Sequence, residues 1–421
     1  MSPISPLHAG GHPDRSPGSP PRVLLPYMES TGAGHRRAAE AVEKVLRRDF
    51  APIDTATVNL LDYSSGAIRD AYHEMRASII REAPHFLGQL YAWYDRPRDP
   101  KRSIFDRALL AFQRFTHREL LDILKGGSFD AIVNTHFFAA ELCASLRRDG
   151  KIRAPLFTVT TDYLTHGMWI SNPSEGYFVA TREAVHHLGG SGVGEKDIHL
   201  TGIPVDPVFA EDKDISACRQ RFGLDPEEGA DPVVLLSTGG FSGETTREIA
   251  RALLAVERPI QIVAVAGRSD DRRAALEQAL SVPNAHRHRV QVLGFTDAMD
   301  ELVRACDLHL TKAGGLTVAE GLSVGRPFAI VSPTPDQEAQ NSDYLLEQGV
   351  AVRVHDETTL PFKIGTVVGD RERLGAMRHR ARAIGRPRAA EDVARRVLEV
   401  AGRYWGQAVR GPGAEEAIPE E

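Results

Sequence analysis

The chain has 421 residues, of which 42% are hydrophobic and 26% charged, and its formal net charge is −6. This length suffices for two domains with complete cores, and the composition excludes a disordered chain. The negative charge gives no general attraction to nucleic acid, and no apolar run approaches the ~20 residues of a membrane-spanning helix. The three cysteines are widely separated, which argues against a disulfide framework or a structural zinc site and fits a reducing cytoplasm.

Residues 1–21 are rich in Pro, Gly, Ser and His and lack the apolar segment of a secretory signal, so we expect a disordered tail there. A buried strand is expected from Arg22 (RVLLPYM), followed by the glycine turn STGAGH and a helix (RRAAEAVEKVLRRDF). His35 closes this turn. An imidazole with a pKa of about 6.5 can take the proton of an attacking hydroxyl, or it can cap the turn and donate to a backbone carbonyl. The residues themselves leave both interpretations open.

A predominantly helical stretch is expected from Tyr63 to about Lys125, with aromatic residues interleaved with arginines. Such a stretch suits either a domain core or a membrane interface, and we expect core for most positions. The segment from Leu87 to Arg102 is the exception. Its prolines argue against one continuous helix, and its aromatic and basic residues lie too close together to separate into a core face and a solvated face.

The strand LFTVTT is expected to end at Asp162, and His166 and Trp169 follow it. A carboxylate, an imidazole and an indole would then emerge from one strand end, although Asp162 can equally cap a turn. The segment Gly202–Val205 is the expected hinge. It divides the chain into an N-terminal domain over residues 22–205 and a C-terminal domain over 206–385, followed by a helix over 386–410 and an acidic tail over 411–421.

The C-terminal domain opens with a strand, a glycine turn and a helix (PVVLLSTGGFSGETTREIARALL), and the same order recurs in DLHLTKAGGLTVAEGLSVG, where we expect the helix to begin at Leu316. Backbone N–H groups at a helix N-terminus favour a diphosphate. Lys312 would add a positive charge, Glu320 can accept hydrogen bonds from a ribose diol, and a loop with Gln337 and Glu338 suits sugar hydroxyls at a strand's carboxyl end. The glycines alone are better read as plain connections, and it is this combination that predicts a phosphate-and-sugar site.

The segments TKAGGLTVAEGL and PDQEAQN resemble the donor-binding signature of UDP-sugar glycosyltransferases that make glycolipids, including the monogalactosyldiacylglycerol synthases and the processive diacylglycerol glucosyltransferases. STGAGH resembles the TGGGH-type motif of the same family, with Ala33 in place of the middle glycine. TDYLTHGMW and IHLTGIPVDPVF are similar to the diacylglycerol glucosyltransferases. The resemblance implies an α/β fold of GT-B type, with two doubly wound Rossmann-like domains facing a cleft and the helix over 386–410 crossing back to the N-terminal domain.

The resemblance also implies a reaction: inverting transfer of a hexosyl unit from a UDP-sugar to a lipid hydroxyl, with diacylglycerol the first choice. The enzyme would be cytoplasmic, peripherally associated with the inner face of the cell membrane, and would need no metal or other cofactor. His35 would activate the acceptor hydroxyl, and Asp162 would orient His35 or serve as the alternative base. The implied acceptor-binding residues are Gly32, Gly34, His166 and Trp169. The implied donor-binding residues, with the uracil near Phe295 and Thr296, are Gly239, Gly240, Gly243, Phe295, Thr296, Lys312, Gly314, Gly315, Leu316, Thr317, Glu320, Gln337, Glu338 and Asn341.

Other functions stay open. A UDP-sugar epimerase or a non-catalytic nucleotide-sugar sensor would use the same fold, and a different lipid can replace diacylglycerol. His35, Asp162 and Glu320 together weigh against a degenerate site. The sugar is undetermined, although Asp336, where the family's PGQE-type motif has glycine, disfavours an anionic sugar through like-charge repulsion.

Overall fold

The structure is a computed structural model, and it describes residues 20–29, 32–66, 69–72, 74, 78, 100–226, 231–281, 287–331 and 337–404. Most of the expected N-terminal tail, residues 87–99 and the acidic C-terminal tail lie outside these residues. The chain divides into two units, Met1–Pro207 with Arg388–Glu421, and Val208–Pro387. The sequence had placed the corresponding boundaries after residues 205 and 385. None of the described helices is both long and apolar enough to cross a membrane.

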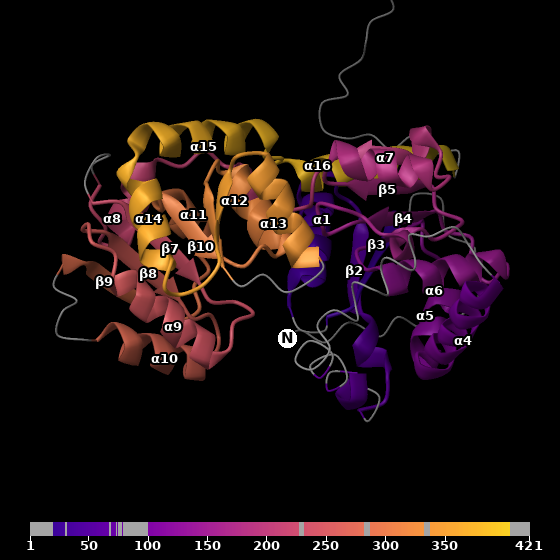
Figure 1. The fold of residues 1–421 in the computed structure, drawn as a ribbon. Helices are drawn as coiled ribbons and strands as arrows, with labels where there is room; N and C mark the ends of the chain where they lie inside the picture. Colours follow the sequence, from indigo (N-terminus) through magenta and orange to yellow (C-terminus); the bar gives the residue numbers. More distant parts are fainter. Residues whose placement is uncertain are drawn as a thin grey trace, which may run out of the picture. The chain divides into compact units, whose positions relative to one another are not determined.

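The first unit is built on a six-stranded parallel sheet with the order β2-β1-β3-β4-β5-β6 (Figure 1). Its strands are β1 (Arg22–Tyr27), β2 (Asp54–Asn59), β3 (Ala131–Asn134), β4 (Leu156–Val159), β5 (Gly176–Val179) and β6 (Ile198–Leu200). Its helices are α1 (Gly34–Asp49), α4 (Pro100–Thr116), α5 (Arg118–Gly126), α6 (Phe137–Arg148), α7 (Arg182–Gly190) and α16 (Ala389–Tyr404), with short 3-10 helices η1 (Leu60–Tyr63), η2 (Gly167–Trp169) and η3 (Glu195–Asp197).

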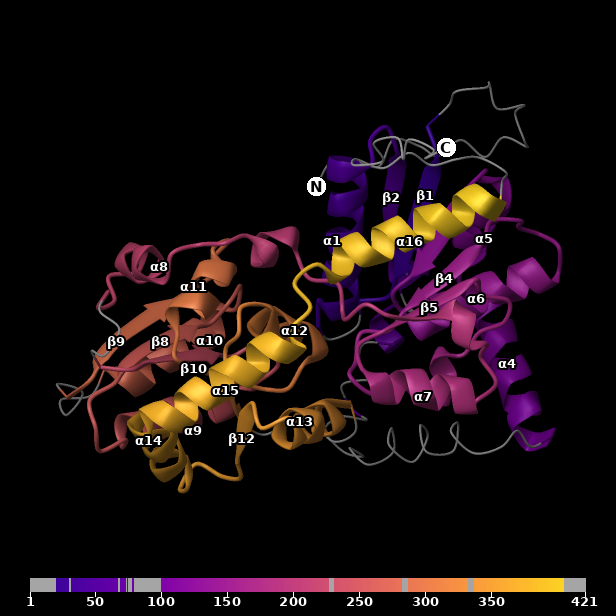
Figure 2. The ribbon, with the colours of Figure 1, turned by 90° about the horizontal axis from the view of Figure 1, so that it is seen from above.

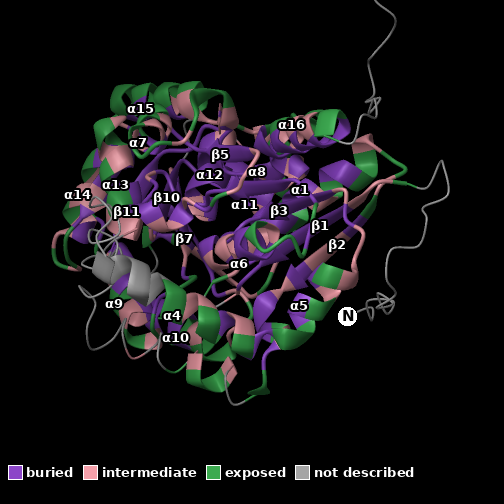
Figure 3. Ribbon diagram, turned by 90° about the vertical axis from the view of Figure 1, so that its right-hand side faces the viewer, coloured by how far each residue is buried: buried purple, intermediate pink, exposed green. Residues whose placement is uncertain are grey.

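Apolar residues on both faces of β1 bury it between two helical layers. Val23 and Leu25 pack with α1 and α16, whereas Leu24 packs with α5 and α6. Burial on both faces is what a parallel sheet requires, and it explains the continuous apolar run RVLLPY. Figure 3 shows the inner strands β1 and β3 as buried and the outer helix faces as exposed.

The last helix, α16, belongs to the first unit although it follows the second in sequence. Its apolar residues recur at helical spacing, and Val393, Val397 and Leu398 are buried in the same core as α1. It covers the same face of this sheet as α1 (Figure 2). The sequence had predicted a helix here over residues 386–410.

The second unit repeats the plan with the order β12-β11-β10-β7-β8-β9, again all parallel. Its strands are β7 (Val233–Ser237), β8 (Gln261–Val265), β9 (Arg289–Leu293), β10 (Leu308–Thr311), β11 (Phe328–Val331) and β12 (Ala351–Val354). Its helices are α8 (Ile215–Arg221), α9 (Gly243–Leu254), α10 (Asp270–Leu280), α11 (Met299–Ala305), α12 (Gly315–Ser323), α13 (Gln337–Glu347), α14 (Leu360–Gly369) and α15 (Arg371–Ile384), and the 3-10 helix η4 (Pro207–Ala210) leads into it.

Three boundaries differ from those expected. β4 ends at Val159, so Asp162 lies in the loop three residues beyond the strand rather than at its end. The helical stretch to Lys125 is broken at His117, between α4 and α5. Gln337 and Glu338 form the first turn of α13 rather than a loop. In each case the residue types are suited to either state, and packing against the sheet decides the boundary.

Both sheets reverse their strand order beside the first strand of the unit. From β1 the chain moves outward to β2 and returns on the other side as β3, and from β7 it moves to β8 and β9 and returns as β10. In the first sheet, the loops after β1 and β3 therefore leave the carboxyl edge in opposite directions. In the second sheet, the loops after β7 and β10 do the same. Open α/β sheets bind ligands at such points, at the carboxyl ends of the strands.

A buried histidine in β10 makes the stability of the second unit depend on pH. Burial lowers the pKa of His309 to about 3. Its unfolded value is about 6.5, so below that pH the unfolded chain binds a proton that the folded chain does not, and stability present at neutral pH is lost as the pH falls. We expect His309 to reduce the free energy of unfolding by about 1.2 kcal/mol between about pH 7 and pH 5.5.

Urea unfolding of wild type and His309→Asn at these two pH values measures this contribution. The variant should lose less stability on acidification than wild type, and the exposed His186→Asn serves as the matched control. An equal pH dependence in wild type and His309→Asn would show that the folded state accommodates the charged ring.

Candidate active site

His35 lies at the reversal point of the first sheet, in the first turn of α1. Its Nδ1 is 2.7 Å from the carbonyl oxygen of Thr135, which directly follows β3, and 3.1 Å from Oγ1 of Thr161, which follows β4. The hydroxyl of Thr135 in turn donates to the carbonyl oxygen of His35 at 2.9 Å. The ring is thus held by residues that follow two adjacent strands, β3 and β4.

These contacts determine which nitrogen of His35 carries the hydrogen. A carbonyl oxygen can only accept, so Nδ1–H donates to Thr135 and the neutral ring keeps its lone pair on Nε2. The side chain is half-buried. A neutral imidazole whose Nε2 is an acceptor has the form that a general base requires.

A second histidine, His136, lies beside the first, with ring centroids 4.5 Å apart in an edge-to-face arrangement. Its Nδ1 accepts a hydrogen bond from the backbone N–H of Phe138 at 3.1 Å and so caps α6. In the neutral ring Nε2 then carries the hydrogen, the opposite tautomer to that of His35. Sequence reasoning gave His136 no role, and the signal available was its position directly after a buried apolar run.

Trp169, expected at the acceptor, is fully buried. Its ring lies 6.3 Å from that of His35 and 5.6 Å from that of Phe137. His166 is 4% exposed and Asp162 is 9% exposed. Of these three buried residues, Trp169 lies beside His35 and His166 lies beside Trp169, with ring centroids 6.1 Å apart, whereas Gly32 is exposed and Gly34 begins α1.

In the second unit the two glycine turns meet at the reversal point between β7 and β10. Nζ of Lys312, directly after β10, lies 5.3 Å from the centre of the Phe241 ring, which follows β7. A Cβ at Gly240 would come within 3.7 Å of the Lys312 side chain, and Gly240 has φ of +81°, which favours glycine. Lys312, the lysine that the sequence predicted for the donor site, thus lies close to the turn after β7 as well as in its own turn after β10.

Two helices begin at these turns. α9 starts at Gly243 and is capped by Ser242, whose Oγ accepts from the N–H of Thr245. α12 starts at Gly315 with Gly314 at its N-cap, where glycine offers no side chain to cap the helix. Its first-turn N–H groups therefore point out with the positive end of the helix dipole, next to Lys312. This is an environment suited to an anion.

Asn341 and Glu320 lie behind the turn that follows β10. Asn341 is fully buried, and its Nδ2 donates to the carbonyl oxygen of Ala313 at 3.0 Å. Glu320 is 3% exposed on the inner side of α12. Asn341 thus braces the turn. Gln337, Glu338 and Thr317 are half-buried, and Leu316 is buried.

The predicted uracil region follows β9. Phe295 is 51% exposed, and the guanidinium of Arg268, which follows β8, lies over its ring at 3.6 Å. Oγ1 of Thr296 accepts from the N–H of Ala298 at the start of α11. Sequence reasoning missed Arg268, because nothing in the residues around it indicates that its side chain stacks on Phe295 in the loop after β9.

Comparisons with known proteins agree with this geometry. Residues 35–205 match the family model of monogalactosyldiacylglycerol synthase, and residues 243–393 match the C-terminal domain of glycosyltransferase family 28. These two matches confirm the resemblance to UDP-sugar glycosyltransferases that the motifs indicated. The fold is of GT-B type, with a Rossmann-like domain in each unit.

Curated relatives are named processive diacylglycerol beta-glucosyltransferase. The chain is 28% identical to that of Bacillus subtilis over 382 residues, covering 90% of this chain and 95% of the relative. It is 29% identical to that of Bacillus pumilus over 255 residues, spanning 60% of this chain and 64% of the relative. Among solved structures it is similar to Acinetobacter baumannii MurG, with a TM-score of 0.58 at 17% identity over 90% and 100% of the two chains. It is also similar to Phytolacca americana UGT2, with a TM-score of 0.58 at 14% identity over 92% and 100%.

Proposed function

We propose that this UDP-sugar-dependent hexosyltransferase moves a hexosyl unit to the hydroxyl of diacylglycerol and inverts the anomeric centre. The observation that carries the proposal is the fixed tautomer of His35 in a domain that matches the monogalactosyldiacylglycerol synthases. The relatives named diacylglycerol glucosyltransferase support diacylglycerol as acceptor and glucose as the sugar to test first.

In the proposed reaction Nε2 of His35 takes the proton of the acceptor hydroxyl as its oxygen attacks the anomeric carbon. The bond from that carbon to the diphosphate oxygen breaks, and UDP leaves. Donation from Nδ1–H to the carbonyl oxygen of Thr135 stabilises the imidazolium that forms. Direct attack by one nucleophile inverts the configuration, and Asp162 remains the alternative base.

The leaving diphosphate gains negative charge, and the second unit offers positive groups that are already oriented. Lys312 and the N-terminus of α12 lie side by side at the reversal point. Fixed dipoles and a full charge cost no reorganisation as charge develops. We propose that these groups carry the stabilisation and that the reaction proceeds without a divalent metal.

Two exposed aromatic residues support contact with a membrane surface. On α4, Phe112 is 59% and Phe115 is 63% exposed, and the guanidinium of Arg118 lies 4.7 Å from the centre of the Phe115 ring. Aromatic rings beside basic groups suit the headgroup region of a bilayer. We propose that the enzyme binds peripherally to the inner face of the cell membrane.

Epimerase chemistry is the rival reading, because a UDP-GlcNAc 2-epimerase of Neisseria meningitidis shares this fold with a TM-score of 0.53 at 12% identity over 90% of this chain and 100% of that one. That likeness concerns the fold alone. The match of the first domain to a glycolipid synthase model favours transfer to a lipid.

A transfer assay tests the proposal: purified protein, radiolabelled UDP-sugars, and mixed micelles with or without diacylglycerol, each in buffer with and without EDTA. Label should enter the organic phase only with diacylglycerol, at a rate that EDTA does not change. Isomerised UDP-sugar without lipid labelling would favour the epimerase. Binding of UDP-sugar without any turnover would favour a sensor, and a rate abolished by EDTA would refute the metal-free mechanism.

Replacing His35 with Ala should lower kcat by about 10²–10⁴ because the base is lost. UDP affinity should stay at the wild-type value, since the residue belongs to the first unit's site. Turnover of the lipid acceptor and UDP binding by calorimetry measure the two effects, with the exposed His186→Ala as control. Unchanged turnover would refute the assignment of His35 as the base and favour Asp162 in that role.

Replacing Lys312 with Met should weaken UDP binding by about 10- to 100-fold, as expected for one hydrogen bond to a charged group. Binding of uridine, which lacks the diphosphate, should change little. Lys363→Met on α14 makes the same charge change on a different element of the unit. Equal loss for UDP and uridine would indicate a damaged fold rather than a lost phosphate contact.

A further inference from the structure

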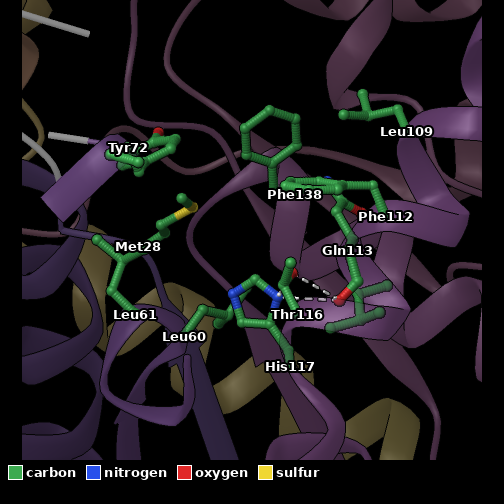
Figure 4. Close-up of a pocket in the computed structure, with 12 residues that line it drawn as sticks. Met28, Leu60, Leu61, Tyr72, Leu109, Phe112, Gln113, Thr116, His117 and Phe138 are labelled. Carbon is green, nitrogen blue, oxygen red and sulfur yellow. Dashed lines mark hydrogen bonds between the residues drawn. The ribbon is translucent and has the colours of Figure 1, made fainter. Parts of the chain in front are cut away.

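The first unit contains an apolar pocket that no step of the proposed reaction has used. Its volume is about 340 Å³, within the range of small-ligand sites. Residues of β1's loop, η1, α4 and α6 line it, and nearly all of its surface is carbon. Figure 4 shows the side chains around it, among them Met28, Leu61, Tyr72, Leu109, Phe112 and Phe138.

The polar side chains at this pocket carry no charge at neutral pH. His117 is 6% exposed, and its Nδ1–H donates to the carbonyl oxygen of Gln113 at 3.0 Å (Figure 4). Burial lowers the pKa of His117, so the neutral ring is favoured. Gln113 is itself 8% exposed. An uncharged pocket with a carbon surface suits hydrocarbon and disfavours any charged ligand.

The pocket lies at the same sheet edge as His35. Met28 directly follows β1, and Leu61 belongs to η1, which directly follows β2. Phe138 lies 5.4 Å from the ring of His136, which lies 4.5 Å from the ring of His35. The ring of His136 therefore lies between Phe138 at the pocket wall and His35, the proposed base.

A lipid acceptor has the matching arrangement, with a hydroxyl at one end and hydrocarbon attached a few bonds away. We propose that this pocket binds one hydrocarbon chain of the lipid acceptor and so places the acceptor hydroxyl at His35. The assignment rests on the proposed lipid-transferring function. The exposed ring of Phe112 at the wall gives the chain an apolar route from a lipid surface.

Two pairs of variants on exposed or half-exposed positions test the assignment. Leu109→Glu places a carboxylate at the pocket, and Ala108→Glu places one at the exposed neighbouring position of the same helix. Ala71→Phe fills the pocket from its exposed wall, and Asp70→Phe adds the same ring at an exposed residue that does not line it. Circular dichroism and UDP binding verify that all four remain folded.

The first readout is calorimetric binding of 1-decanol, a hydrocarbon chain without glycerol. Wild type, Ala108→Glu and Asp70→Phe should bind alike, and Leu109→Glu and Ala71→Phe should bind at least about tenfold more weakly, since each methylene kept out of an apolar site costs about fourfold in affinity. Equal decanol affinity in Leu109→Glu and Ala108→Glu would overturn the pocket assignment. Failure of the wild-type protein to bind decanol would also overturn the pocket assignment, and it is the result expected if a segment of the chain itself fills the pocket.

The second readout is sugar transfer to dioctanoylglycerol. The pocket variants should raise KM about tenfold or more and leave UDP affinity unchanged, while their controls keep the wild-type KM. Wild-type binding of decanol without transfer to any diacylglycerol would refute the proposed function and leave the hydrocarbon site standing. An unchanged KM in both pocket variants, with transfer intact, would overturn the pocket's role in acceptor binding.

Discussion

The pairing of β1 with β3 is the constraint on which the first site depends. The two strands are separated by more than 100 residues of sequence, yet their pairing brings Thr135 beside the first turn of α1. The carbonyl oxygen of Thr135 then fixes the tautomer of His35, and Thr161, which follows the next strand over, contacts the same nitrogen. A reactive group is thus held by backbone geometry that the sheet itself determines, which is more rigid than a side chain on a free loop.

The second unit uses the same reversal of strand order for a different chemical purpose. Its loops bring together a lysine, a glycine N-cap and a glycine with positive φ, which together present positive charge and accessible backbone. Asn341 supports this turn from the core through the carbonyl oxygen of Ala313. The same kind of strand reversal therefore lies at a candidate base in one domain and at a candidate anion site in the other, because the loops at the two points carry different side chains.

In the first unit, the apolar pocket and the polar site of His35 are both built from residues that follow neighbouring strands. The residues that follow β1 and β2 supply the wall of the pocket, and those that follow β1, β3 and β4 supply the site of His35. A lipid with one hydroxyl needs both kinds of environment within a short distance. Trp169, His166 and Asp162 of the same unit are buried, whereas the apolar pocket has room for a hydrocarbon chain.

The sequence by itself determined the alternation of strands and helices, the two-domain plan and the glycine turns, and it proposed His35 and Lys312 as site residues, because these follow from local patterns and short motifs. Tertiary structure decided which of the candidate residues are exposed and which are buried. Asp162, Trp169 and Asn341 have residue types that suit a surface site, but the sheet and helix packing buries them. It also supplied Thr135, His136 and Arg268, whose roles arise from contacts between loops of neighbouring strands. Such contacts depend on strand order, which no local pattern in one sequence encodes.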